Sequence, residues 1–175
     1  MSHRALPSPE VVGTHKALLG EGPVWDPRSG RLLWVDISNG QLLATDPDTG
    51  MTAARELGMA AGIVLPRADG GYVAALQDGF YALDHAGDPE LIAAVEASDP
   101  STRFNDGEID PGGRLWAGTM GWEGEPERGT LYRLDADGSV HSMIEGVSIS
   151  NGLGWSPDGR TMYYVDTPTM RIDRF

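Results

Sequence analysis

Hydrophobic and polar residues alternate in short runs along most of the chain, and each run ends in a turn rich in Gly, Pro and Asp. In residues 21–37 the run EGPVWD is followed by the turn PRSG and a second run, RLLWVDI. Alternation in twos is the pattern of a β-strand, whereas an amphipathic helix repeats its apolar residues every three to four positions. Asp and Gly at the corners are typical of tight hairpin turns. The pattern therefore predicts an all-β protein made of antiparallel hairpins.

The same hairpin recurs at a regular interval. Four segments align with one another, at residues 21–37, 61–76, 105–120 and 151–166. Spacings of 40, 45 and 45 residues separate their leading glycines, Gly22, Gly62, Gly107 and Gly152. A second hairpin follows three of the segments, at 42–50, 80–88 and 131–139. Four antiparallel strands per repeat of this length indicate the blades of a β-propeller. A β-sandwich is the alternative fold, but it does not require a regular period.

The repeat predicts four blades and their boundaries, at 15–58, 59–102, 103–146 and 147–175. The fourth blade is incomplete because no outer hairpin follows its first two strands. Two architectures are compatible with this. In the first, residues 11–19 supply the missing outer strand and close a four-bladed ring. In the second, which we favour for the reason given below, the chain covers part of a longer propeller.

Composition and charge narrow the possible functions. The chain has 175 residues, of which 40% are apolar and 22% charged, which is ordinary for a globular domain. With 13 basic and 26 acidic residues the net charge is −13, which disfavours binding to nucleic acid or anionic membranes. Cys is absent and the four His are scattered, so thiolate and HExxH metal sites are excluded. Since no apolar run approaches a membrane span and no signal sequence is recognisable, we expect a cytoplasmic protein.

Polar residues occupy the starts of the innermost strands, which surround the central channel of a propeller. The equivalent positions are Glu21, Ala61, Asp106 with its neighbour Asn105, and Asn151. Carboxylate and amide oxygens suit a divalent cation such as Ca²⁺ or Mg²⁺, and Mn²⁺ or Zn²⁺ also accept them. Asn-Gly and Asp-Gly are also common turn pairs, so the spacing by itself leaves both interpretations open.

Three motifs help to decide between a metal site and ordinary turn pairs. The strings GEGPVWDPRSGRLLWVDI, RFNDGEIDPGGRLWAGTM and ISNGLGWSPDGRTMYYVDT occur in this order. Together they resemble the signature segments of the SMP-30/gluconolactonase family, which includes regucalcin and bacterial sugar lactonases. The resemblance runs from residue 15 to residue 175. It implies a six-bladed β-propeller with one divalent metal in its channel, of which residues 1–175 form a single truncated domain with roughly the first four blades.

The resemblance also implies roles for individual residues. Glu21 in GEGP and Asn151 in SNGL match metal ligands of the family. Asn105 in RFND matches a substrate-binding residue that in some relatives also lies near or on the metal. Arg103 resembles the residue that holds the sugar hydroxyls, and Glu123, in the loop after AGTM, resembles a further substrate contact.

The implied activity is metal-dependent hydrolysis of sugar lactones, with a small-molecule sugar lactone as the partner. The family pattern also requires a later Asp, in the fifth blade, that binds the metal and acts as general base. Because this chain ends at Phe175, we expect it to be weakly active or inactive by itself. RFND and SNGL favour the sugar-lactonase branch over organophosphate-hydrolysing or strictosidine-synthase-like propellers.

Two non-enzymatic functions remain as alternatives: a propeller that serves as a binding scaffold, and a calcium-binding regulatory protein. A scaffold has no need of converging channel ligands such as Glu21, Asn105 and Asn151. The tryptophans are informative about packing. Trp25, Trp116 and Trp155 are expected between blades, whereas Trp122 lies in the loop 121–129 and is a candidate for the channel mouth.

Overall fold

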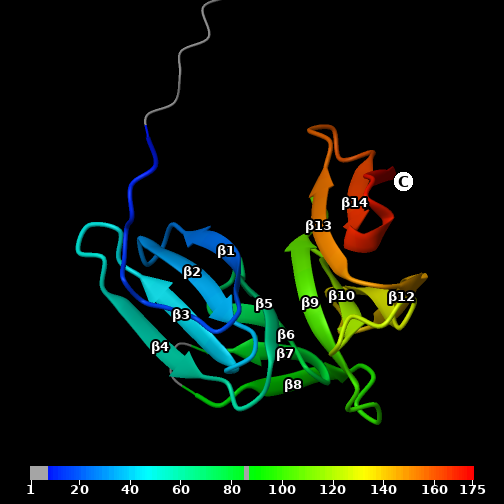
Figure 1. Cartoon of the computed structure of the whole chain (residues 1–175), viewed down its shortest axis with the longest axis horizontal. Helices are drawn as coiled ribbons and strands as arrows, with labels where there is room; N and C mark the ends of the chain where they lie inside the picture. Colours follow the sequence, from blue (N-terminus) through cyan, green and yellow to red (C-terminus); the bar gives the residue numbers. More distant parts are fainter. Residues whose placement is uncertain (1–7, 85–86) are drawn as a thin grey trace, which may run out of the picture.

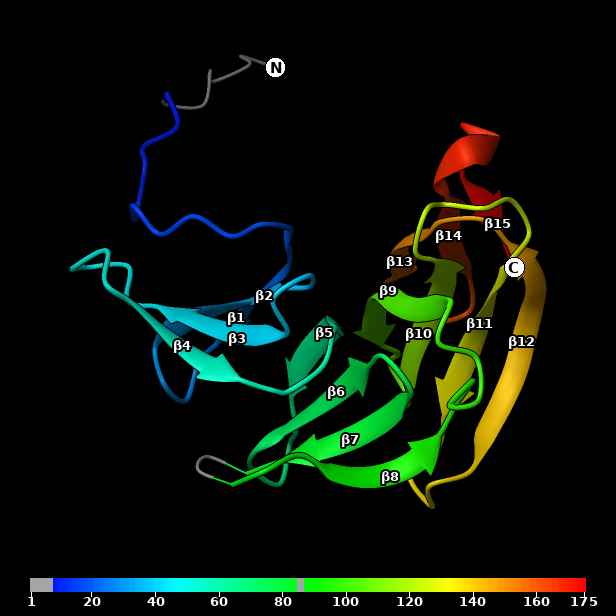
Figure 2. The same cartoon turned by 60° about the horizontal axis from the view of Figure 1, so that its bottom comes forward.

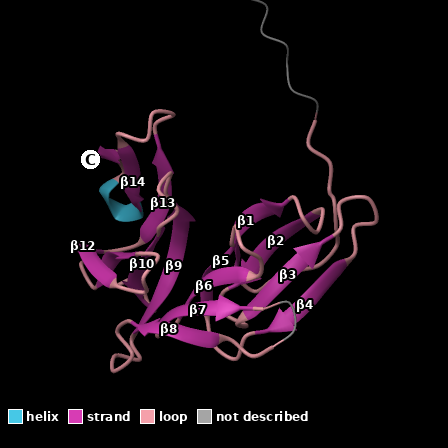
Figure 3. Cartoon of the chain, turned by 180° about the vertical axis from the view of Figure 1, so that it is seen from behind, coloured by secondary structure: helices cyan, strands magenta, loops and turns pink. Residues whose placement is uncertain are grey.

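The computed structural model describes residues 8–84 and 87–175, and this part of the chain is almost entirely β-structure (Figure 3). Strands β1 to β15 form four antiparallel sheets, and a single turn of 3-10 helix, η1 (Thr167–Thr169), follows β14. The all-β expectation is confirmed. No helix in the described ranges has the length and hydropathy needed to span a bilayer.

Each sheet is one blade, and the strands follow one another from the inside of the blade to the outside. The first blade contains β1 (Gly20–Asp26), β2 (Arg31–Asp36), β3 (Gln41–Thr45) and β4 (Thr52–Glu56). The second contains β5 (Ala61–Pro66), β6 (Tyr72–Leu76), β7 (Gly79–Leu83) and β8 (Glu90–Ala94). The third contains β9 (Thr102–Ile109), β10 (Leu115–Gly121), β11 (Gly129–Leu134) and β12 (Val140–Val147). The fourth contains β13 (Ser150–Trp155), β14 (Met162–Asp166) and β15 (Asp173–Arg174).

The four blades agree to within one residue with the boundaries that the repeat predicts, since the third blade begins at Thr102 and ends at Val147. Residues 85–86, in the turn of the predicted hairpin at 80–88, lie outside the described residues. The fourth blade is three-stranded in the described part of the chain, as expected for an incomplete blade.

The alternative closed ring is not formed, since residues 11–19 do not join the sheet of β13 to β15. They run along the first blade instead, where the N–H groups of Leu18 and Leu19 donate to the Asp36 carboxylate.

The four sheets are arranged as an open arc, with the first and fourth blades at its two ends (Figures 1 and 2). The innermost strands contact one another in order along the arc, β1 with β5, β5 with β9, and β9 with β13. Their starting residues therefore come together on the inside of the arc. This is the architecture of a β-propeller, and the β-sandwich alternative is wrong.

The hydrophobic core consists of three clusters, one between each pair of neighbouring blades. Strand β6 shows why. Its residues Tyr72, Ala74 and Leu76 pack toward the first blade, while Val73 and Ala75 pack toward the third. A strand in the middle of the arc is thus buried on both faces, which gives a continuous apolar run in place of strict alternation.

The two outward faces of the arc lack a neighbouring blade. Val24 of β1 packs into the core, so the next residue, Trp25, points the other way and is 51% exposed. Tyr163 of β14 lies between the buried Met162 and Tyr164 and is 44% exposed. The prediction that Trp25 packs between blades is therefore wrong for this arc, whereas Trp116 and Trp155 do pack together between the third and fourth blades.

Candidate functional site

A β-bulge interrupts each innermost strand close to its start. Register shifts fall between Glu21 and Val24, between Ala61 and Ile63, and between Asn151 and Leu153. In β9, Phe104 pairs with Thr119 and Asp106 with Gly118, so Asn105 lies between two paired residues without a partner of its own. A bulge leaves a residue unpaired and re-aims its side chain, and bulges are common beside active sites. Local backbone geometry therefore marks the same positions that the repeat picked out.

Asn105 connects the third blade to the fourth. Its side-chain amide accepts a hydrogen bond from Arg103 Nη1 at 2.7 Å. Its Nδ2 donates to the Ser150 carbonyl at 2.8 Å and to Asn151 Oδ1 at 3.1 Å. Asn105 is only 8% exposed, so both ends of its amide are committed to these neighbours. Three residues that the sequence marked as site residues thus form one hydrogen-bonded chain.

Arg103 is the buried cation of this site. Its side chain is 5% exposed, and Nη1 also donates to the Phe104 carbonyl at 3.1 Å. Its Nε is buried and donates to nothing in the described residues. Burial lowers the pKa of the Arg103 guanidinium, and the negative charge of Glu21 works against that shift. Glu21 and Arg103 are therefore within electrostatic reach of each other, although they lie in different blades.

Asp106, which follows Asn105, is a half-buried carboxylate of the site. Its Oδ1 accepts from the N–H of Gly107 and its Oδ2 from the N–H of Gly152, both at 2.8 Å. Burial raises the pKa of the Asp106 carboxyl, and the two backbone hydrogen bonds oppose the rise. Asp106 and Glu21 line the same small cavity of about 190 Å³. The structure thus brings two carboxylates to the place where the sequence analysis expected a ring of oxygens.

Glu123 does not join this group. It is exposed in the loop after β10, and its N–H donates to Glu125 Oε2 at 3.1 Å. Its neighbour Trp122 lies against Arg103 instead, with Cζ of the guanidinium 5.3 Å from the centroid of the indole ring. The loop therefore brings an aromatic ring to the buried arginine, and the prediction that Glu123 contacts substrate stays a prediction.

Two residues of the site escaped the sequence analysis. Ser150 is fully buried, provides the carbonyl that holds Asn105, and accepts a hydrogen bond from the Tyr164 hydroxyl at 2.9 Å. Thr167 Oγ1 accepts from Asn151 Nδ2 at 2.7 Å. The hairpin register gave no signal for Thr167, because Asn151 pairs with Val165 and Thr167 follows the end of β14, where its N–H donates to the Ile149 carbonyl.

The donor atoms at this site fit a hard divalent cation in type. Glu21 and Asp106 offer carboxylate oxygens, and Asn151 offers an amide oxygen with one lone pair left after Asn105 donates to it. Among the described residues, however, no three His, Cys, Asp or Glu side chains are grouped closely enough to hold a metal. The carboxylates of the described residues therefore do not form a metal-binding cluster by themselves.

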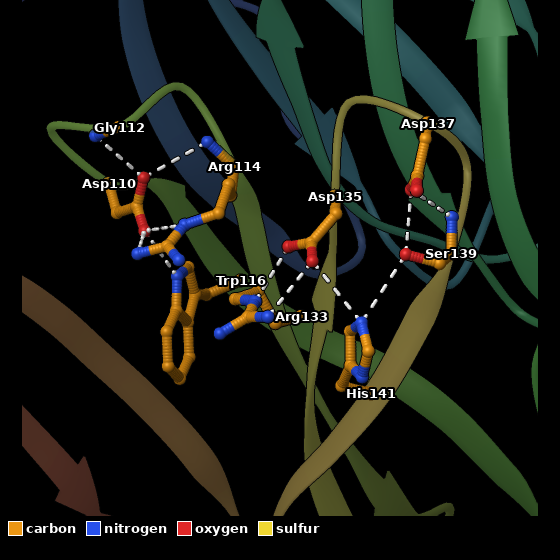
Figure 4. A network of polar contacts seen from close by, with 9 residues as sticks. All are labelled: Asp110, Gly112, Arg114, Trp116, Arg133, Asp135, Asp137, Ser139 and His141. Atoms are coloured by element: carbon orange, nitrogen blue, oxygen red, sulfur yellow. Dashed lines mark hydrogen bonds and ion pairs between the residues drawn. The ribbon is translucent and has the colours of Figure 1, made fainter.

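A second polar network lies at the opposite end of the third blade (Figure 4). It contains a Ser, a His and an Asp, but their geometry is not that of a catalytic triad. Ser139 Oγ and Asp135 Oδ2 both contact Nε2 of His141, at 3.3 and 3.2 Å. A triad requires the Asp and the Ser on different ring nitrogens. We therefore assign this network to the stability of the turns, together with Asp110, which accepts from Trp116 Nε1 at 2.9 Å and from Arg114.

A protein-family model, described as the SMP-30/Gluconolactonase/LRE-like region, matches residues 19–175 of this chain. The chain belongs to this family. The match covers all four blades, so the family assignment rests on nearly the whole of the described fold and not on one motif.

The similar proteins of this family include one named as a lactonase and one named regucalcin. The chain is 39% identical to 6-deoxy-6-sulfogluconolactonase from Pseudomonas putida over 167 residues, which cover 95% of this chain and 57% of the relative. It is 38% identical to regucalcin from Xenopus laevis over 170 residues, which cover 94% of this chain and 57% of the relative.

A solved structure confirms the fold. The calcium-binding protein regucalcin from Agrobacterium tumefaciens strain C58 superposes with a TM-score of 0.88 at 35% identity, covering 94% of this chain and 56% of that protein. The SMP-30/gluconolactonase chain described here thus spans about half the length of the relatives it matches.

Proposed function

We propose that this chain forms the substrate-binding half of a hydrolase that opens sugar lactones with the help of a divalent cation. The observation that carries the proposal is the hydrogen-bonded chain Arg103–Asn105–Asn151, which lies at the starts of neighbouring inner strands and within electrostatic reach of Glu21. A relative that is 39% identical is named 6-deoxy-6-sulfogluconolactonase, which supports a sugar lactone as the substrate.

Glu21 and Asn151 would hold the cation, with Asn105 as a possible third ligand. Calcium, zinc, manganese and magnesium all accept such oxygen donors, and the regucalcin from Agrobacterium tumefaciens is described as calcium-binding. When bound, the cation would supply a Lewis acid that polarises the lactone carbonyl.

Arg103, Asn105 and Glu123 are the proposed substrate contacts. Arg103 is permanently charged, and its buried Nε lacks an acceptor in the described residues, so a sugar hydroxyl is a suitable partner for it. Asn105 holds the guanidinium in place through Oδ1. Fixing the sugar relative to the attacking water lowers the entropic part of the barrier.

Hydrolysis also needs a group that removes a proton from water. Asp106 is a half-buried carboxylate next to Asn105 in the chain, but each of its oxygens already accepts a backbone hydrogen bond. The family resemblance supports the proposal that the general base lies in a later blade. We therefore propose that the chain binds the sugar but hydrolyses lactone slowly or not at all, because a general base typically contributes about 10²- to 10⁴-fold in rate.

Hydrolysis of glucono-1,5-lactone with added Ca²⁺, Mn²⁺, Zn²⁺ or Mg²⁺ tests the proposal. The chain is compared with a version extended through two further blades of the family, and gluconate binding to both is measured by calorimetry. We expect binding by both proteins and rapid turnover by the extended one alone. Asn151→Ala should abolish turnover, whereas the matched control Asp158→Asn, at an exposed turn, should not change it. An extended protein that neither binds nor hydrolyses would overturn the proposal.

Comparable rates for the two proteins would instead locate the base within residues 1–175, and Asp106→Asn would then be the decisive substitution. The relatives named regucalcin favour one second candidate, a calcium-binding regulatory protein. Calcium binding by the extended protein without lactone turnover would support that candidate.

A further inference from the structure

Trp122 has no role in the function proposed above, yet it contacts the most deeply buried charge of the site. Its ring lies over the guanidinium of Arg103, 5.3 Å from Cζ to the ring centroid, and is itself 37% exposed. The indole ring therefore contacts a buried cation and is also partly exposed to solvent.

The loop that carries Trp122 is attached to the body of the molecule at both ends. The N–H of Trp122 donates to the Ser101 carbonyl at 3.0 Å. Arg128 Nη2 donates to Asp99 Oδ2 at 2.6 Å and to Ser101 Oγ at 2.9 Å. Because the loop is anchored beside the start of β9, where Arg103 lies, these hydrogen bonds hold the ring over the guanidinium.

We propose that Trp122 is the positioning residue for Arg103 in the sugar site. The indole face covers one face of the guanidinium, excludes water from it and fixes its plane, so that its in-plane N–H groups are directed at ligand oxygens. A desolvated cation–π contact with Trp, the best of the aromatic partners, is strong enough to do this. The inference rests on the proposed function for the identity of the ligand, but not for the contact itself.

The chemistry of Arg103 explains why it needs such a partner. Nη1 is fixed by the Phe104 carbonyl and by Asn105, but the buried Nε has no acceptor in the described residues. A buried donor without an acceptor is costly, and the cost is removed when a ligand oxygen arrives. Holding the guanidinium in one plane beforehand reduces the ordering that the ligand must otherwise impose.

The first test needs no ligand. The Nε–H resonance of Arg103, assigned by its loss in Arg103→Lys, is followed in the full chain by nitrogen-15 NMR. In Trp122→Leu we expect the ring-current shift of this resonance to vanish and its exchange with water to accelerate by about tenfold, whereas Trp122→Phe, which keeps a ring, retains most of both effects. The matched control is Trp25→Leu, an exposed tryptophan on the outer face of the first blade. An unchanged Arg103 resonance in Trp122→Leu would overturn the inference.

The second test measures gluconate binding by calorimetry and, in the protein extended by two blades, KM and kcat for glucono-1,5-lactone. For Trp122→Leu we expect Kd and KM to rise by about tenfold with kcat within about twofold, because a contact made equally in ground and transition states affects binding only. Trp122→Phe should restore most of the loss.

The two tests separate the two ideas. If Trp122→Leu removes the ring-current shift of the Arg103 resonance but the protein binds no sugar, the proposed function is refuted and the contact is confirmed. If the wild-type protein and Trp122→Leu bind gluconate equally tightly, the positioning role is refuted and the proposed function stands.

Discussion

Aspartates fix the backbone at equivalent places in the first and fourth blades, one of them buried (Asp36) and the other half-buried (Asp166). Asp36 accepts hydrogen bonds from the N–H groups of Leu18 and Leu19, at 2.8 and 3.2 Å. Asp166 does the same for Ser148 and Ile149, at 3.1 and 2.8 Å. In both cases the carboxylate at the end of a blade's second strand holds the segment that leads into the innermost strand. The repeat thus conserves a polar contact as well as a hydrophobic pattern.

The first prediction concerns stability in acid. Burial by itself would raise the pKa of Asp26, Asp36 and Asp110, but hydrogen bonds from side chains and backbone N–H groups outweigh it and hold each pKa below the usual Asp value. A lowered folded pKa gives stability that is present above the unfolded pKa, near ~3.9, and is lost as the pH falls through the folded pKa.

We therefore expect the melting temperature to be nearly constant between pH ~7 and ~5 and to fall steeply below pH ~4. Thermal unfolding followed by circular dichroism at pH steps checks this. Asp36→Asn should flatten the acid limb as well as lower the stability at neutral pH. A melting temperature that stays level or rises below pH ~4 would show that the hydrogen bonds do not outweigh burial.

The second prediction concerns the hub of the candidate site. Asn105→Asp replaces the donor Nδ2 with an acceptor that faces the Ser150 carbonyl and Asn151 Oδ1. The substitution leaves oxygen facing oxygen in a buried place, so we expect a loss of about 2–4 kcal/mol in the free energy of unfolding, measured in urea. Asn105→Ala removes the donor and also the oxygen that accepts from Arg103, but it places no acceptor opposite the Ser150 carbonyl, so it should cost less. If Asn105→Asp is as stable as the wild type, the bridge between the third and fourth blades is not formed as described.

At the scale of strands, the sequence predicted the blades well and the site only in part. Alternation and turn residues are local signals, and they set the strand pairs and the blade boundaries. The alignment of Asn105 with Asn151 also followed from the repeat, whereas Arg103 was marked only by the family resemblance. The contact of Trp122 with Arg103 followed from neither, because it depends on loop anchors at Asp99 and Ser101 that no local pattern reveals. Glu123 as a substrate contact stays a prediction.

Close approach of two inner strands explains one glycine of the repeat. A Cβ on Gly62 of β5 would meet the backbone of Phe104 and Asn105 in β9 at 2.7–2.9 Å, too close for any side chain. The backbone atoms contacted cannot rotate away as a flexible side chain can. The glycine therefore allows the second and third blades to approach closely beside Asn105, the residue of β9 that has no partner in β10.

The third prediction follows from this contact. Gly62→Ala should destabilise the protein by about 1–3 kcal/mol, since overpacking moves backbone, and it should also weaken gluconate binding by displacing Asn105. Urea unfolding and calorimetry measure the two effects. The matched control is Gly154→Ala, in the inner strand β13, where an added Cβ meets nothing within 4 Å. Equal stability of the two variants would mean that the inner strands can separate without cost.

At the scale of the whole molecule, the arc leaves apolar side chains exposed at both ends. Trp25 points away from the core on the first blade, and Tyr163, Ile172 and Phe175 are exposed on the fourth. In the middle of the arc, outward-facing strand residues are covered by the next blade, as the two faces of β6 show. The Trp25 prediction was wrong for this reason: whether a strand residue is buried between blades depends on a neighbour that the strand's own pattern does not encode.

The fourth prediction is that the isolated chain associates through these two outward faces. Exposed apolar patches on β-sheets favour association, and the net charge of −13 opposes it by repulsion between copies. We therefore expect apparent mass to increase with concentration and, because salt screens the repulsion, to increase further at about 0.5 M NaCl. Size-exclusion chromatography with light scattering measures both trends. The double variant Trp25→Ser with Tyr163→Ser should shift the chain toward monomer, whereas Met51→Ser, which removes an exposed apolar side chain from a turn, should not. A monomer that melts cooperatively and ignores both salt and concentration would show that the outward faces are stable in water without a partner.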